Sequence, residues 1–171
     1  MTASRSMTAI ASALTAALIA SPATAYADCG DPGQDPCNGP VPTVDQVAEI
    51  MAELTDPNKP AAAKTNIVAP GFTPDEAQTI DDHLNRMNAH GGRLPLDIAV
   101  TNIQPAPDNL AGATIETNGP GPIYTQTGPN PIVLVDQDGH WLITHDSATQ
   151  ILDKFWRHAN RRYVPVVPFV P

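Results

Sequence analysis

Basic residues are scarce in this sequence, which holds nine Lys and Arg against 18 Asp and Glu, a formal net charge of -9. Proteins that hold nucleic acid neutralise its phosphates with clustered Lys and Arg side chains. The acidic balance therefore excludes a general role in binding polyanions, and we expect no nucleic-acid partner. Aromatic residues make up only 5% and cysteines number two, yet 171 residues are enough to build the core of one ordinary domain.

Familiar catalytic motifs are also missing: the sequence has no Walker loop, no G-x-S-x-G and no HExxH. His145, Asp146 and Ser147 are triad residue types, but three consecutive residues cannot converge as base, orienting group and nucleophile. We interpret them as the cap of a helix. The best candidate for catalysis is Asp97, an interior strand carboxylate with His140 or His145 as companion base. A strand aspartate usually just faces water, so we expect a protein that is not an enzyme.

If the protein has a ligand pocket, we expect it to be lined by one carboxylate and two aromatic rings. The interpretation of the two aromatic residues as core or pocket lining is stronger than their interpretation as groups that stack on a ligand. The candidate pocket residues are Asp97, Tyr124 and Trp141.

Residue types that bind metals occur together in two places. His83 and His90 lie seven residues apart on one face of an expected helix, beside two aspartates, but a solvated acidic face explains this cluster. Asp136 and Asp138 precede Gly139 as at the start of a calcium loop, yet the remaining ligand positions do not follow. A hairpin turn explains these residues better. We therefore expect no metal and no cofactor.

Residues 1–27 have the three parts of a secretory signal peptide. Arg5 is the only charged residue among them, and an apolar stretch follows from Met7 to Ala20. Ala25-Tyr26-Ala27 then presents small residues at the two positions that signal peptidase examines, which predicts cleavage after Ala27. We expect a secreted, extracellular protein that is free in the medium or associated with the cell wall, and that keeps no transmembrane anchor after cleavage.

Residues 28–42 form an extended leader with four prolines, three glycines and one apolar side chain besides the cysteines. Such a composition cannot bury enough apolar surface to offset the entropy of ordering the chain. Cys29 and Cys37 are the only cysteines, and export would place them in an oxidising compartment, so we expect a disulfide between them. Their spacing differs from the C-x-x-C of redox proteins, which argues against a catalytic role.

Helical periodicity marks the first half of the domain that we place at residues 43–160. Thr43 and Gln46 have the spacing of a capping box before one helix, and Thr73 and Glu76 have it before another. A short helical turn lies between the two helices. Their expected buried faces comprise Val44, Val47, Ile50, Met51 and Leu54 in the first helix and Ala77, Ile80, Leu84 and Met87 in the second.

After the second helix the apolar period changes to 2, which predicts strands. One strand begins at Leu94, weaker strands follow at 111–117 and 123–127, and a hairpin joins Ile132–Val135 to His140–Thr144. Because Ile132–Val135 is apolar on both faces, we expect helices on one side and a second layer or a lined cavity on the other. A last helix with an apolar stripe completes an α+β fold, with helices packed on a curved antiparallel sheet of about four strands.

The C-terminal tail, residues 161–171, repeats proline at every third position from Pro165 and fills the spaces mostly with valine. This is the period of polyproline II, and apolar side chains on such a tail need a partner surface. Folding back onto the domain and contact with another macromolecule are equally supported. Basic residues that precede the tail suit a helix C-terminus or an anionic envelope component. The candidate contact residues are Val164, Pro165, Val167, Pro168 and Phe169.

Five stretches between Val41 and Phe155 resemble one known family, the small secreted low-molecular-weight T-cell antigens of mycobacteria and their actinobacterial relatives. The resemblance implies an exported α+β domain similar to the cystatin-like or nuclear-transport-factor-2-like cone, with no catalytic residue to carry over. It also implies recognition by a host immune system where the source is a pathogen. The cysteine pair and the VPVVPFVP tail depart from the family pattern. The stretches are VPT at 41–43, LTDPN at 54–58, AHGGRLPL at 89–96, VTNIQPAP at 100–107 and DGHWLITHDSATQIL at 138–152.

The functional expectation is therefore a secreted, non-catalytic interaction or binding domain that contacts an unidentified protein or cell-envelope component. The alternative is a small-ligand carrier or a cone-fold enzyme that uses a cavity between the sheet and the helices.

Overall fold

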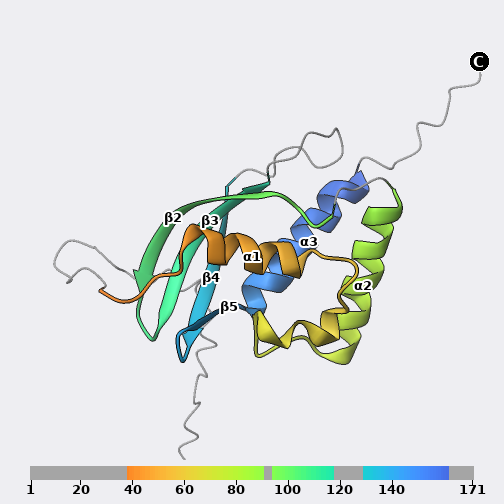
Figure 1. Ribbon diagram of the computed structural model, residues 1–171. Coiled ribbons are helices and arrows are strands. Elements are labelled where there is room, and N and C mark those ends of the chain that lie inside the picture. Colours follow the sequence, from red (N-terminus) through yellow and green to blue (C-terminus); the bar gives the residue numbers. More distant parts are fainter. Residues whose placement is uncertain (1–37, 91–93, 118–128, 162–171) are drawn as a thin grey trace, which may run out of the picture.

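The computed structural model describes residues 38–90, 94–117 and 129–161 (Figure 1). The expected signal peptide, the cysteine pair and the candidate tail contacts lie outside these residues. So do Tyr124 and the weak strand expected at 123–127. Within the described residues, no helix is both apolar enough and long enough to span a membrane.

Two helices begin with the capping boxes that the sequence predicts. Helix α1 spans Val44–Leu54, and the Thr43 hydroxyl accepts from the Gln46 amide at 3.2 Å while Gln46 Oε1 accepts from the Thr43 amide at 2.8 Å. Helix α2 spans Pro74–Ala89, where Thr73 and Glu76 make the same reciprocal pair. Each box satisfies amide groups that have no partner within the helix. The expected buried faces are confirmed except at Val44, which is exposed.

A buried lysine closes the C-terminal end of α1. The 3-10 helix η1, Ala61–Asn66, carries Lys64 into the interior, where only 1% of the residue is exposed. Its Nζ donates to the Leu54 carbonyl at 2.7 Å and to the Asp56 carbonyl at 3.1 Å. Asp81 of α2 accepts from the Ala61 amide at 2.8 Å, so η1 links the end of α1 to α2.

The sheet has five strands in the order β1-β5-β4-β3-β2. The α+β prediction is confirmed, but the expected purely antiparallel sheet of four strands is wrong in one respect. β1 adds a short parallel strand beside β5 at one edge, whereas the other neighbours are antiparallel. Whether the fold belongs with the cystatin-like or nuclear-transport-factor-2-like cones stays a prediction. The strands are β1 Val68–Ala69, β2 Ile98–Ala106, β3 Leu110–Thr117, β4 Asn130–Gln137 and β5 His140–Thr144.

The β4–β5 connection is the hairpin turn expected from its Asp-Gly sequence. Asp138 and Gly139 both have positive φ, 56° and 86°, as a type I′ turn requires. The Asp136 carboxylate accepts from the Gly139 amide at 2.8 Å. The acidic residues here therefore shape the turn.

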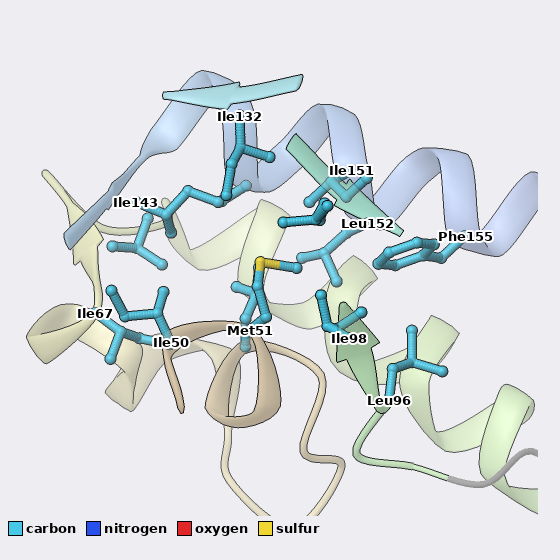
Figure 2. Packing of buried hydrophobic residues seen from close by; sticks show 14 of the residues in the cluster. Ile50, Met51, Ile67, Leu96, Ile98, Ile132, Ile143, Ile151, Leu152 and Phe155 are labelled. Atoms are coloured by element: carbon cyan, nitrogen blue, oxygen red, sulfur yellow. The ribbon is translucent and has the colours of Figure 1, made fainter. Parts of the chain in front are cut away.

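Helix α3, His145–Arg161, follows β5 directly and packs with α1 on one face of the sheet. Figure 2 shows side chains from both helices and from the strands pointing into a common core, among them Met51 of α1, Ile132 of β4 and Leu152 of α3. Ser147 does not cap α3 as expected. The helix begins two residues earlier, and the Ser147 hydroxyl accepts from the Val133 amide of β4 at 2.9 Å.

The two faces of β4 differ in how well they are covered. Ile132 and Leu134 are fully buried against the helices, whereas Val133 and Val135 on the opposite face are half-buried. The sequence predicts that both faces of this strand are covered. Among the described residues, the face with Val133 and Val135 is only partly covered.

Candidate functional site

The candidate site is a pocket of about 360 Å³ between α2 and α3. These helices run side by side in the same direction in Figure 1. The volume lies within the range of small-molecule sites, and apolar side chains of both helices form most of the surface. Ile80, Leu84, Met87, Leu152 and Phe155 form the apolar lining, and Thr55, Asp75, Glu76, Thr79, His83, Thr149 and Asp153 the polar part.

Thr55, at the C-terminal end of α1, is the only fully buried polar residue that the structure describes in the pocket lining. Its hydroxyl donates to the Met51 carbonyl at 2.9 Å and accepts from the Leu96 amide at 3.0 Å. Both hydrogen-bonding roles of the hydroxyl are therefore taken by the backbone. In this part of the pocket, a ligand could therefore make only apolar contacts.

Among the residues that the structure describes, the exposed part of the lining carries three carboxylates and no Lys or Arg. Asp75 and Glu76 come from the first turn of α2, where acidic residues are favoured by the helix dipole. Asp153 comes from α3 and pairs with Arg157 one turn later, with 2.7 Å between Oδ2 and Nε. The polar groups at the surface of the pocket are therefore mainly acceptors.

A histidine–carboxylate contact joins the N-terminal ends of the two helices. His145 Nε2 lies 3.1 Å from Glu76 Oε2, and its Nδ1 lies 3.5 Å from Asp146 Oδ1. The hydrogen bond to Glu76 is the largest cause that raises the pKa of His145 above 6.5. Hydrogen bonds from Thr73, followed by the contact with His145, lower the pKa of Glu76 to about 2.

An aromatic contact joins the helices further along. The His83 ring stacks on the Trp156 ring with centroids 4.0 Å apart. Burial lowers the pKa of His83 below 6.5, and the positive charge of Arg86 adds to the effect. His83, which lines the pocket, is therefore held in its neutral form.

Both histidines at or beside the pocket have fixed partners. His145 faces a carboxylate from each ring nitrogen, an arrangement that favours the doubly protonated ring. His83 is neutral, but one face of its ring is covered by the Trp156 ring.

Of the residues that the sequence singles out for a pocket, Asp97 and Trp141 do not line this one, and Tyr124 lies outside the described residues. Asp97 lies exposed just before β2, and Trp141 of β5 is buried in the core. His140, the other companion base considered, bonds the Asn66 carbonyl at 2.9 Å. The fold therefore does not bring Asp97, Trp141 and His140 together at the pocket.

Sequence reasoning missed the pocket because its parts are distant in the chain. Glu76 and His145 are separated by 69 residues, and the sequence around His83 is typical of a solvated acidic face. The detectable signals were the two apolar helical stripes, which predict that α2 and α3 bury their faces but not that they leave space between them. Among residues 38–90, 94–117 and 129–161, no group of three or more His, Cys, Asp or Glu is placed to hold a metal ion.

The comparison with known families gives a match over most of the chain. Residues 40–157 match the family model described as "Low molecular weight antigen MTB12, C-terminal domain". This stretch contains the described helices and strands almost completely and includes all residues that line the pocket.

Individual relatives agree with the family match. The chain is 35% identical over 119 residues to the low molecular weight antigen MTB12 of Mycobacterium bovis and to that of Mycobacterium tuberculosis, which covers 69% of this chain and 68% of each relative. It is 31% identical over 122 residues to the MTB12 homolog of Mycobacterium leprae, which covers 70% of both chains. The chain belongs to the family of the low molecular weight antigen MTB12.

Proposed function

We propose that this protein is an exported, non-catalytic binding domain, and that its ligand site is the pocket between α2 and α3. The observation that carries the proposal is the pocket itself, whose buried part is formed mainly by apolar side chains of both helices and whose carboxylates lie toward the surface. Sites of this kind hold small molecules or an apolar anchor of a larger partner. For the alternative, a small-ligand carrier, we propose the same pocket between two helices, instead of a cavity between the sheet and the helices.

The cell surface or the medium is the proposed setting. The signal-like residues 1–27 support export. The relatives are named low molecular weight antigens, and exposure outside the cell would agree with that name. A cell-envelope component or another protein is the proposed partner, with the apolar tail residues Val164–Pro171 as a second contact. Recognition by a host immune system belongs to the proposal where the source organism has a host.

A blocking substitution tests the pocket. The neutral fluorophore N-phenylnaphthylamine should gain fluorescence when it binds the apolar lining, and Thr79→Trp should suppress this gain by filling the opening. Thr79 is exposed and its hydroxyl bonds only the Asp75 carbonyl in the described part of the chain, so the fold should tolerate the change. The control is Gln78→Trp, the adjacent exposed residue, which does not line the pocket. Equal fluorescence in both variants and the unsubstituted protein would contradict the assignment.

Fractionation of cells tests the setting. The protein recovered outside the cytoplasm should begin at Asp28, which N-terminal sequencing or mass spectrometry would establish. Deletion of Val164–Pro171 should move wall-associated protein into the medium. Protein that retains Met1 and stays in the cytoplasm would contradict export, and unchanged fractionation of the deletion variant would contradict the role of the tail.

A further inference from the structure

We propose that the pocket between α2 and α3 selects small amphipathic cations, molecules with a compact hydrocarbon body and an ammonium or guanidinium group at one end. This inference rests on the proposed function, since it names the class of ligand for the same pocket. It follows from the different chemistry of the buried and exposed parts of the lining.

The buried part of the lining accepts hydrocarbon. Leu84, Met87 and Phe155 are each nearly fully buried and come from both helices. The Thr55 hydroxyl already donates to one backbone group and accepts from another. A polar ligand group placed here would lose its hydrogen bonds to water without replacement, which is costly. The apolar end of a ligand must therefore point inward.

The exposed part of the lining favours a positive donor. Its charged residues in the described part of the chain are Asp75, Glu76 and Asp153, and an ionised carboxylate only accepts hydrogen bonds. The low pKa of Glu76 keeps this group ionised at neutral pH. A ligand anion would meet three like charges here, and a neutral alcohol would gain no charge attraction.

Two of the neighbouring cations are already paired with carboxylates of the lining, and a third, Arg86, acts on His83 further along α2. Arg157 is bound to Asp153 and His145 to Glu76, each through one carboxylate oxygen. Asp75 makes no ion pair with any residue that the structure describes, and it is exposed. The chain as a whole carries a net charge of -9, which attracts cations toward the surface from a distance. Asp75 is thus the carboxylate with which a ligand cation would pair.

The test uses three probes that share one hydrocarbon cage and differ only in the charged end. Adamantylmethylamine is a cation at neutral pH, adamantylmethanol is neutral and adamantanecarboxylate is an anion. Binding to the purified protein would be followed by amide shifts in nuclear magnetic resonance spectra and by calorimetry at low salt. We expect the amine to bind about two- to fivefold more tightly than the alcohol, the range that a solvent-exposed ion pair supplies, and the carboxylate to bind most weakly. Added salt should reduce the advantage of the amine.

A matched pair of variants assigns the charge effect to one residue. Asp75→Asn should remove most of the preference for the amine and leave binding of the alcohol unchanged. Asp45→Asn is the control, because Asp45 occupies the same position after the capping threonine of α1, is exposed and does not line the pocket. It removes the same charge from the chain without touching the site.

The outcomes separate the ligand class from the pocket. Equal binding of the amine and the alcohol, or tightest binding of the carboxylate, would overturn the inference while leaving the pocket in place. Equal effects of Asp75→Asn and Asp45→Asn would overturn the assignment of the cation to this pocket. Absence of binding by all three probes, together with no effect of Thr79→Trp on the neutral fluorophore, would overturn both the inference and the proposed function.

Discussion

The imidazole ring of His83 lies nearly parallel to the indole ring of Trp156, with 7° between the ring planes. This stack joins the middle of α2 to α3. The contact between Glu76 and His145 joins the same helices near their first turns. The pocket lies along the interface that these two contacts define, and one residue of each contact, His83 and Glu76, belongs to its lining. Each contact contains a histidine, and the two rings favour opposite charge states.

The pKa of His83 should be measurable through Trp156. Burial lowers the pKa of His83 below 6.5, so the folded protein binds this proton less well than the unfolded chain. His83 therefore contributes stability above pH 6.5 that is lost as the pH falls through its lowered pKa. A protonated imidazole stacked on indole quenches its fluorescence. We expect a fall in tryptophan emission with a midpoint below pH 6.5.

Two variants assign that fluorescence change. His83→Gln should abolish the transition while both tryptophans remain, and Trp156→Phe should abolish it while the histidine remains. A transition that persists in either variant would show that another titrating group near Trp141 or Trp156 is responsible.

The contact between Glu76 and His145 should stabilise the fold in a defined pH window. The pKa of His145 is raised above 6.5, so its contribution is complete below pH 6.5 and is lost as the pH rises through the raised value. The pKa of Glu76 is lowered from 4.5 to about 2, so its contribution is complete above pH 4.5 and is lost as the pH falls toward 2. The two together predict the strongest effect between pH 4.5 and 6.5.

Glu76→Gln isolates the charge from the helix cap. Gln46 performs the same capping role in α1, with Oε1 2.8 Å from the Thr43 amide, so glutamine at position 76 should keep the capping box. The pKa of His145, followed by the resonance of its ring proton during a pH titration, should be lower in the variant than in the unsubstituted protein. An unchanged pKa would mean that Asp146 or another group controls the ring.

Lys64 should give the protein an unusual alkaline stability. Burial lowers its pKa from 10.5 to about 8, against the attraction of Asp81, Asp56 and Glu53. The folded state therefore holds this proton less well than the unfolded chain, and the stability that Lys64 contributes rises as the pH increases from about 8 to 10.5. Relative to Lys64→Met, the free energy of unfolding should rise by about 1 kcal/mol per pH unit in this interval.

Urea unfolding at several pH values measures this difference, with Lys59→Met as control. Lys59 is a surface residue whose side chain is 52% exposed and pairs with Glu53 at 3.2 Å. The control removes the same charge without emptying a buried site, so its difference from the unsubstituted protein should stay within about 0.5 kcal/mol across the range. If the difference in free energy of unfolding between the unsubstituted protein and Lys64→Met did not change with pH, the buried-lysine assignment would be contradicted.

Features that depend on neighbouring residues were predictable from the sequence. The capping boxes at Thr43 and Thr73 act over three residues, and the turn at Asp138 depends on the conformational freedom of Gly139 beside it. Apolar periodicity placed α1, α2 and α3 because a helix repeats its buried face every turn, whatever lies opposite. The α+β class follows from these elements and from the hairpins.

Features that depend on the fold were not predictable. β1 is two residues long, too short to show a period, and it is a strand only because Val68 pairs with Ile143 of β5. Strand β2 begins at Ile98 and not at Leu94. The charge on Lys64 suggests a surface position, yet the open carbonyl groups at the end of α1 hold it inside. A pocket is the space that packing leaves, and no local pattern encodes it.

Thr55 should be needed for stability through its hydroxyl rather than its shape. Thr55→Val keeps nearly the same volume but leaves the Leu96 amide without its acceptor at a fully buried position, which should lower the free energy of unfolding by about 1–3 kcal/mol. Thr55→Ser keeps the hydroxyl and removes one methyl group, which should cost less than about 1 kcal/mol. Chemical denaturation of the two variants gives the comparison, and hydrogen exchange at the Leu96 amide should accelerate only in Thr55→Val. If serine proved as damaging as valine, the methyl contact and not the hydrogen bond would hold the start of this segment against α1.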